Sequence, residues 1–151
     1  MSSDKLTIHE RMTVQMQYVV PLIRDLQDIL GEDVINEALA ERLRRQLNAA
    51  KQAPSKEADM LRMESDTAKF SAGNALDVEI VKADAEKFDM NVTRCAYAEM
   101  MESMNARDIG HLLICNMDFA AAERIGMVLE RSQTQMQGAD FCDFRYRKKT
   151  T

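Results

Sequence analysis

The sequence of 151 residues has no tryptophan, only three cysteines and no long uninterrupted run of apolar residues. Three cysteines at wide spacing do not form the disulfide framework of a small secreted protein. Short apolar runs exclude a membrane-spanning helix, which needs about 20 apolar residues. No apolar segment follows the first residues, so we expect no signal peptide, a cytoplasmic location, reduced thiols and no membrane partner.

Positive charge is also scarce. The chain has 20 Lys and Arg against 25 Asp and Glu, for a net charge of −5. Because nucleic-acid binding needs a basic surface, we expect no nucleic-acid partner. The sequence also lacks a P-loop, a Gly-x-Gly-x-x-Gly motif, a serine nucleophile elbow, His-Glu-x-x-His and Cys-x-x-Cys. Most nucleotide-binding, serine-hydrolase and zinc-peptidase classes are therefore excluded, and we expect no cofactor and no metal.

What is present suits an ordinary globular protein. The chain is 46% hydrophobic and 30% charged, and its length fits one domain over residues 1–151. Twelve methionines indicate a methionine-rich core, since this side chain fills irregular gaps.

Residues 1–72 are predicted to form a helical layer. Apolar residues recur at spacings of three and four after Thr7, a plausible N-cap. Pro21 predicts a break near residues 18–20, and Gly31 is expected to end the segment. A second helix is expected over residues 34–47, and a third from Pro54, in its first turn, to about residue 69.

Residues 75–148 are predicted to be rich in strands. Apolar and polar residues alternate over residues 76–80 and 88–93, which favours two strands joined by a polar turn. Helical spacing returns at 95–104 and 107–122, and a closing hairpin is expected from residues 127–134 and 141–147. The predicted fold class is α+β, with the helical N-terminal half packed on an antiparallel sheet of about four strands with inserted helices.

Cys95 follows a predicted strand and opens a helix. Thr93 is a possible N-cap and Arg94 stands beside the thiol. A helix N-terminus and a cation both favour the nucleophilic thiolate. The alternative is a small apolar residue packed at a strand-to-helix junction.

His111, Cys115 and Asp118 follow at spacings of four and three, which place them on one face of a helix. Such a face suits a Cys–His pair with an orienting carboxylate, or ligands for a divalent metal with Cys142 as a further ligand. The alternative is a structural role, with Cys115 in the core.

Cys142 lies on a predicted strand face that points into the core or a pocket. On the partner strand, Arg131 ends an otherwise apolar face, so it must pair with a carboxylate or bind one. An internal salt bridge with Asp140 or Asp143 is an equal alternative.

Three blocks together resemble the L-2-amino-thiazoline-4-carboxylic acid hydrolase family: Thr93-Arg94-Cys95, Cys115-Asn116-Met117-Asp118 and Gly138-Ala139-Asp140-Phe141-Cys142-Asp143-Phe144-Arg145. The resemblance is dense over about the last 65 residues. It implies hydrolytic opening of a small cyclic amidine carboxylate, with 2-amino-thiazoline-4-carboxylate going to N-carbamoyl-cysteine. Ala96 departs from the family, where proline is usual, and so does Gln135, where isoleucine is usual.

We therefore expect a hydrolase acting on a non-peptide C–N bond of a small-molecule substrate, with a cysteine nucleophile or an activated water. The candidate catalytic residues are Cys95, Cys142, Asp118, Cys115 and His111, and the candidate substrate-binding residues are Arg131, Arg94, Thr134 and Asp143. The alternative is a non-catalytic small-molecule-binding or sensory domain of the vinyl-reductase-like type. A homo-oligomer is expected because of the long amphipathic N-terminal helix.

Overall fold

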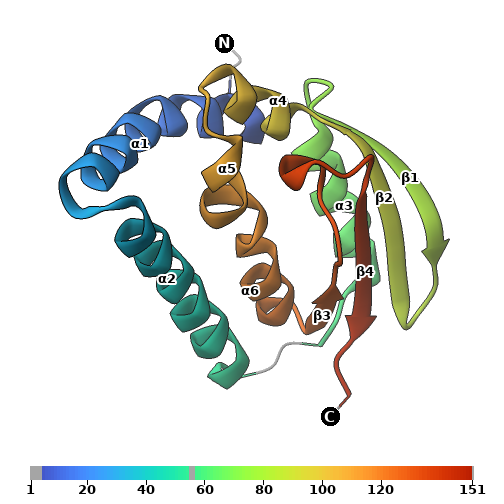
Figure 1. Cartoon of the computed structure of the whole chain (residues 1–151). Coiled ribbons are helices and arrows are strands. Elements are labelled where there is room, and N and C mark those ends of the chain that lie inside the picture. The colour runs from blue at the N-terminus through green and yellow to red at the C-terminus, as the bar shows by residue number, and fades with distance from the viewer. Residues whose placement is uncertain (1–4, 55–56, 151) are drawn as a thin grey trace.

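In the computed structural model, which describes residues 5–54 and 57–150, helices lie on one side and an antiparallel sheet on the other (Figure 1). The predicted α+β class is confirmed. The elements are α1 (Ile8–Leu30), α2 (Glu32–Gln52), α3 (Met60–Ser71), β1 (Leu76–Ala83), β2 (Lys87–Cys95), α4 (Ala96–Ser103), α5 (Arg107–Gly110), a π-helical turn η1 (His111–Cys115), α6 (Met117–Arg124), β3 (Met127–Glu130), a short 3-10 turn η2 (Gln135–Gln137) and β4 (Cys142–Lys148).

Helix α1 runs unbroken through Pro21, so the predicted break is wrong. Proline removes the hydrogen bond to the carbonyl of Gln17, but both residues are exposed, and water can take the place of the missing donor. The ends agree with the sequence: Thr7 and Glu10 form a reciprocal capping box, and Gly31 closes the helix with φ of 100°.

The third helix begins at Met60, later than predicted, and Pro54 lies outside it. Asp59 is the N-cap, because its carboxylate accepts hydrogen bonds from the amides of Leu61 and Arg62 at 3.0 and 3.2 Å. Side-chain capping by aspartate therefore decides where this helix starts.

The sheet is antiparallel throughout, in the order β1-β2-β4-β3. Tyr146 on β4 lies opposite Phe88 on β2 and Leu129 on β3, and these side chains belong to one apolar face. Helices α3 and α6 cover that face through Met63 and Ala122.

Two hydrophobic cores result, one among the helices and one between the sheet and its covering helices. Seven buried methionines fill them, as the composition indicated: Met16, Met100, Met101 and Met136 in the first, and Met63, Met90 and Met127 in the second. Cys95 and Cys115 pack against the first core, while Cys142 begins strand β4 of the sheet. Within the described part of the chain, no helix has the length and apolar character needed to cross a membrane.

Candidate functional site

The helix predicted over residues 107–122 is interrupted by the π-helical turn η1, and its last part, α6, continues to Arg124. The amide of Asn116 donates to the carbonyl of His111 at 3.0 Å, five residues back. This wider turn rotates α6 relative to α5, so a face predicted from regular helical spacing does not continue across it. Single π turns of this kind often occur at functional sites.

Arg131 ties the start of α6 to the end of β3. Its side chain is only 2% exposed and donates to the Asp118 carboxylate at 2.8 Å. The other terminal nitrogen donates to the carbonyl of Cys115 at 3.0 Å and to the side chain of Asn116 at 3.2 Å. The internal salt bridge considered for Arg131 therefore forms, with Asp118 as its partner in place of Asp140 or Asp143.

Two aromatic rings fix the plane of the same guanidinium. The Arg131 carbon Cζ lies 5.0 Å from the ring centroids of both Phe119, on α6, and Phe144, on β4. These two cation–π contacts and the hydrogen bonds at the edge of the guanidinium restrict the orientation of the side chain.

Asp118 is an unusual carboxyl group. Burial raises its pKa to about 6, and the Arg131 guanidinium, which lowers it, offsets this only in part. About a third of the Asp118 side chain, 33%, still reaches solvent. A carboxyl group that is accessible and titrates near neutral pH can both accept and donate a proton.

Cys95 is the N-cap residue of α4, so the role predicted for Thr93 is wrong. Thr93 instead donates its hydroxyl to the carbonyl of Asp77 at 3.3 Å. Burial raises the pKa of the Cys95 thiol, and the amides of Ala98 and Tyr97 at the helix N-terminus lower it without reversing the shift.

The thiols of Cys115 and Cys142 are also held in their protonated form. Burial raises the pKa of Cys115 and of Cys142; the amide of Gln135, which donates to Cys142 Sγ at 3.2 Å, lowers the latter in part. The Asp118 carboxylate further raises the pKa of Cys95 and of both these thiols. The structure thus brings the three thiols, Asp118 and Arg131 into one electrostatic neighbourhood.

His111 does not join this group. Burial lowers the pKa of its imidazole, and the charge that acts on it is that of Asp108, not Asp118. Its Nδ1 is buried and has no hydrogen-bond partner within the described residues. Regular helical spacing predicted His111 on one face with Cys115 and Asp118. The inserted π turn explains why this arrangement does not form.

The remaining candidates hold the backbone or the surface. Thr134 accepts a hydrogen bond from the Gln137 amide at 3.2 Å and caps η2. Asp143 accepts from the amides of Ser132 and Gln133 at 3.0 and 2.9 Å, which fixes the segment after β3. Arg94 pairs with Asp77 at 3.2 Å and with Glu99 at 3.5 Å, both exposed.

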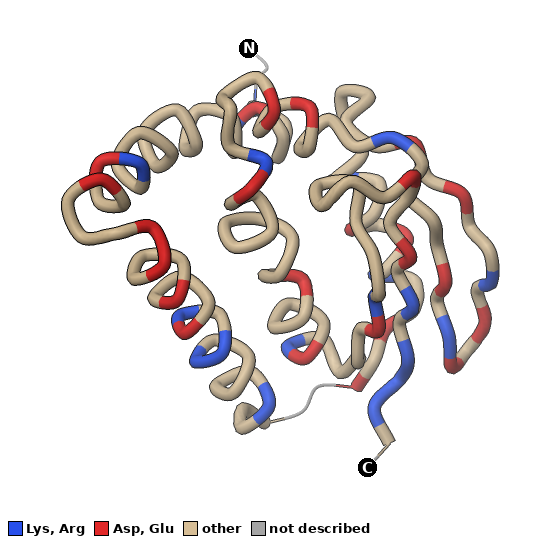
Figure 2. The backbone as a smooth tube through the Cα atoms, in the orientation of Figure 1, with Lys and Arg blue, Asp and Glu red and all other residues tan. Residues whose placement is uncertain are grey.

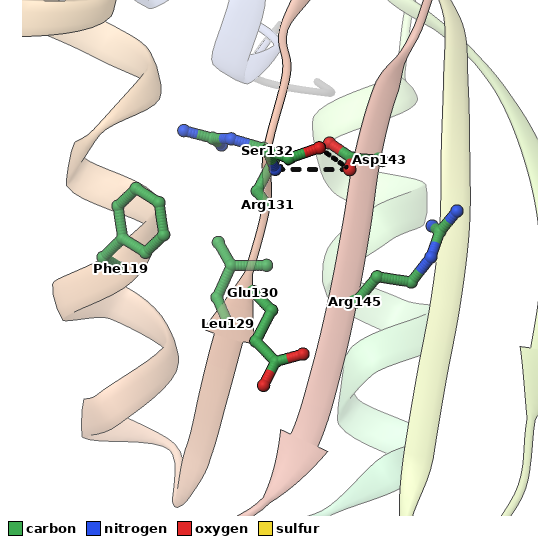
Figure 3. Close-up of a pocket in the computed structure, with 7 residues that line it drawn as sticks. All are labelled: Phe119, Leu129, Glu130, Arg131, Ser132, Asp143 and Arg145. Carbon is green, nitrogen blue, oxygen red and sulfur yellow. Dashed lines mark hydrogen bonds between the residues drawn. The ribbon is translucent and has the colours of Figure 1, made fainter.

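An open depression of about 540 Å³ lies over the edge strand β3, beside α6 (Figure 3). Its lining residues are Phe119, Leu129, Glu130, Arg131, Ser132, Asp143 and Arg145. Arg131 extends toward the helix that carries Phe119, whereas Arg145 extends to the far side of β4, where it donates to Asn91 at 2.9 Å. Of the candidate residues, Arg131 and Asp143 line this depression, whereas Asp118 and the three cysteines do not.

Sequence reasoning gave no role to Phe119, Phe144 or the Gln135 amide. Phe144 belongs to the third block and Phe119 directly follows Asp118 of the second, and these positions were the available signal. Among residues 5–54 and 57–150, no group of three or more His, Cys, Asp or Glu side chains is arranged to hold a metal ion.

Comparison with known proteins agrees with the sequence motifs. The family model described as L-2-amino-thiazoline-4-carboxylic acid hydrolase matches residues 10–146. No curated protein matches the chain. Among solved structures, the phenol-responsive sensory domain of the transcription activator PoxR with phenol is similar at 10% identity, with a TM-score of 0.40 over 85% of this chain and 71% of that chain. A likeness this slight carries no conclusion about function.

Proposed function

The chain belongs to the L-2-amino-thiazoline-4-carboxylic acid hydrolase family, and from that membership we propose that it opens a small cyclic amidine, or a related nitrogen heterocycle with a carboxylate, by hydrolysis. The observation that carries this proposal is the Asp118 carboxyl group, which Arg131 holds at 2.8 Å while a third of its side chain, 33%, stays exposed, and whose pKa burial raises to about 6.

In the proposed reaction Asp118 acts as the general base and then as the general acid. An amidine carbon reacts slowly with neutral water, so the attacking water must lose a proton as its oxygen bonds to that carbon. The Asp118 carboxylate accepts this proton and returns it to the ring atom that departs. One water is consumed, and no oxidant or further group is needed.

The substrate decides which ring bond breaks. For 2-amino-thiazoline-4-carboxylate, a product that keeps its carbamoyl group on nitrogen requires cleavage between the amidine carbon and the ring sulfur, which leaves as a thiol. For a ring that carries nitrogen in the place of the sulfur, the departing atom is nitrogen. The expected C–N hydrolysis therefore applies to the second kind of substrate only.

A cysteine nucleophile is the less favoured route. Cys95 has the best placed thiol, at the N-terminus of α4, but burial keeps its pKa above the usual value. It would attack only after giving its proton to Asp118, and water would then have to displace the sulfur from the amidine carbon. We favour the water route, because it needs no covalent adduct and no earlier transfer of a thiol proton to Asp118.

Arg131 has a positioning role in this proposal. Its guanidinium donates to Asp118, the Cys115 carbonyl and the Asn116 side chain, and the proposal gives it no contact with the substrate carboxylate. It holds the Asp118 carboxylate in one orientation and keeps its pKa from rising further.

The test is a screen of cyclic amidines and hydantoins, including 2-amino-thiazoline-4-carboxylate, with ring-opened products detected by mass spectrometry. We expect turnover of at least one member, and a loss of about 100-fold or more in the Asp118→Asn variant. The Asp66→Asn variant is the matched control, since Asp66 pairs, among the described residues, only with Arg62 and Lys69 on α3 and does not line the depression. No turnover of any member, or full activity in Asp118→Asn, would refute the proposal.

A second candidate, a small-molecule-binding domain without catalysis, is favoured by one observation. All three thiols carry raised pKa values, and the buried guanidinium is already paired, so no nucleophile stands ready. Binding of a heterocyclic ligand would raise the melting temperature of such a domain, and no ring-opened product would be released.

A further inference from the structure

The outer face of α1 is an uncovered apolar stripe. Its exposed members are Val14, Tyr18, Leu22 and Ile29, with Tyr18 73% and Ile29 75% exposed. Their spacings of four, four and seven place them on one side of the helix, opposite the buried Met16, Val20 and Ile23. The buried face of α1 packs it against the core. The exposed apolar stripe lies on the other side and plays no part in that packing.

Charge marks the two ends of the stripe and is missing from its middle. Residues 12–23 contain no Lys, Arg, Asp or Glu, and Figure 2 shows this part of α1 without charged residues. Arg11 directly precedes the uncharged stretch. Arg24, which pairs with Asp108, and then Asp25 follow it, and both Arg11 and Asp25 are exposed. Neither forms an ion pair with another of the described residues.

Between Arg11 and Asp25 the stripe is symmetric in sequence about Tyr18, while Ile29 lies beyond this part. Arg11 and Asp25 stand seven residues from it on either side, and Val14 and Leu22 stand four residues from it. When two copies of α1 pack antiparallel with Tyr18 at the centre, each Arg11 lies opposite an Asp25, and each Val14 opposite a Leu22. A parallel arrangement would instead set arginine against arginine and aspartate against aspartate.

We infer that two copies of this chain associate through the outer face of α1, antiparallel, about a two-fold axis at Tyr18. A two-fold interface must be self-complementary, and the order cation, apolar, aromatic, apolar, anion meets that requirement. A helix of 23 residues is about 35 Å long, enough for a continuous apolar seam between the two copies. This inference does not depend on the proposed function.

An anionic membrane suits the same stripe less well. Asp25, Asp28, Glu32 and Asp33 crowd its C-terminal end, and the chain has a net charge of −5. Helices that lie on membranes carry Lys and Arg beside the apolar face.

The first test is the oligomeric state of the full chain by sedimentation velocity at micromolar concentrations. We expect a dimer for the wild type and a folded monomer for Tyr18→Glu, with circular dichroism to establish folding. The matched control is Leu61→Glu, another exposed apolar residue, 79% exposed on α3, which should stay dimeric. A monomeric wild type, with or without binding to anionic vesicles, or a Tyr18→Glu dimer would overturn the inference.

The second test fixes the orientation. Arg11→Asp should raise the dissociation constant of the dimer several-fold, and adding Asp25→Arg should restore it to within about twofold, since the swapped charges face each other again. A short bis-maleimide should join two copies of Tyr18→Cys but not of Val14→Cys, with the wild type as control for the three native thiols. No rescue by the double variant, or equal joining at both positions, would overturn antiparallel pairing.

Discussion

Arg131 donates a hydrogen bond of 2.8 Å to Asp118 from a side chain that is 2% exposed. The pair is unequal, because the guanidinium is enclosed whereas the carboxylate keeps a third of its surface in contact with solvent. Removing charges from water costs more than their attraction returns unless further hydrogen bonds are made. Arg131 makes those bonds to the π turn, so the pair also fixes where α6 begins.

Replacing Arg131 with methionine should lower the free energy of unfolding by about 3 kcal/mol, because one member of a buried pair is left behind. It should also raise the pKa of Asp118, since the guanidinium that lowers it is gone. Urea unfolding measures the first effect, and the acid limb of the activity profile, moved to higher pH, measures the second. The control Arg62→Met removes a half-exposed pair with Asp66 at 3.4 Å and should cost less than about 1 kcal/mol. Equal costs for the two variants would contradict the central role of Arg131.

The raised pKa of Asp118 also predicts how stability depends on pH. Its folded value of about 6 lies above the ordinary value of 3.8, so the folded chain binds the proton more tightly than the unfolded chain. This contribution is complete below the ordinary value and is lost as pH rises through about 6. The unfolding free energy of the wild type minus that of Asp118→Asn should therefore fall as pH rises over this range and then level off. A difference that is flat or rises with pH would show that the carboxyl is not shifted upward.

Gly110 should resist any larger residue. A Cβ at this position would lie 2.7 Å from Cγ of Met136 and closer still to its sulfur, and Met136 is buried. We expect Gly110→Ala to cost about 1–3 kcal/mol through overpacking, measured by urea unfolding. The cost should shrink in a Met136→Ala background, where the obstructing side chain is absent. An unchanged cost in that background would locate the strain elsewhere.

The thiols should be slow nucleophiles toward added reagents. Because burial raises the pKa of all three, alkylation by iodoacetamide near neutral pH should be about tenfold or more slower than for an exposed cysteine. The same chain unfolded in urea provides the reference rate. Rapid modification of Cys95 in the folded chain would instead support the covalent route.

Much of the fold follows from local patterns in the sequence. The N-cap at Thr7, the closing glycine at Gly31 and the alternating strand around Phe88 depend on neighbouring residues only, and they were predicted correctly. Whether Pro21 breaks a helix depends on whether the freed carbonyl reaches water, which is a property of the folded surface. The sequence offers no sign of that exposure.

The site was harder to predict for a related reason. Spacings of three and four describe a regular helix, and they cannot reveal the residue that a π turn inserts between His111 and Asp118. The partner of Arg131 comes from another element, thirteen residues earlier. The Cys115-to-Asp118 block identified Asp118 and the strand pattern identified Arg131, but neither indicated that the two side chains pair.

The most direct test of the account is kcat/KM for ring opening as a function of pH, in the wild type and in Asp118→Asn. The wild type should lose activity as pH falls through about 6, where the carboxylate takes up its proton. The Asp118→Asn variant should keep a small residual activity that does not fall as pH drops through about 6. A wild-type limb that survives unchanged in Asp118→Asn would contradict the assignment of Asp118 as the general base.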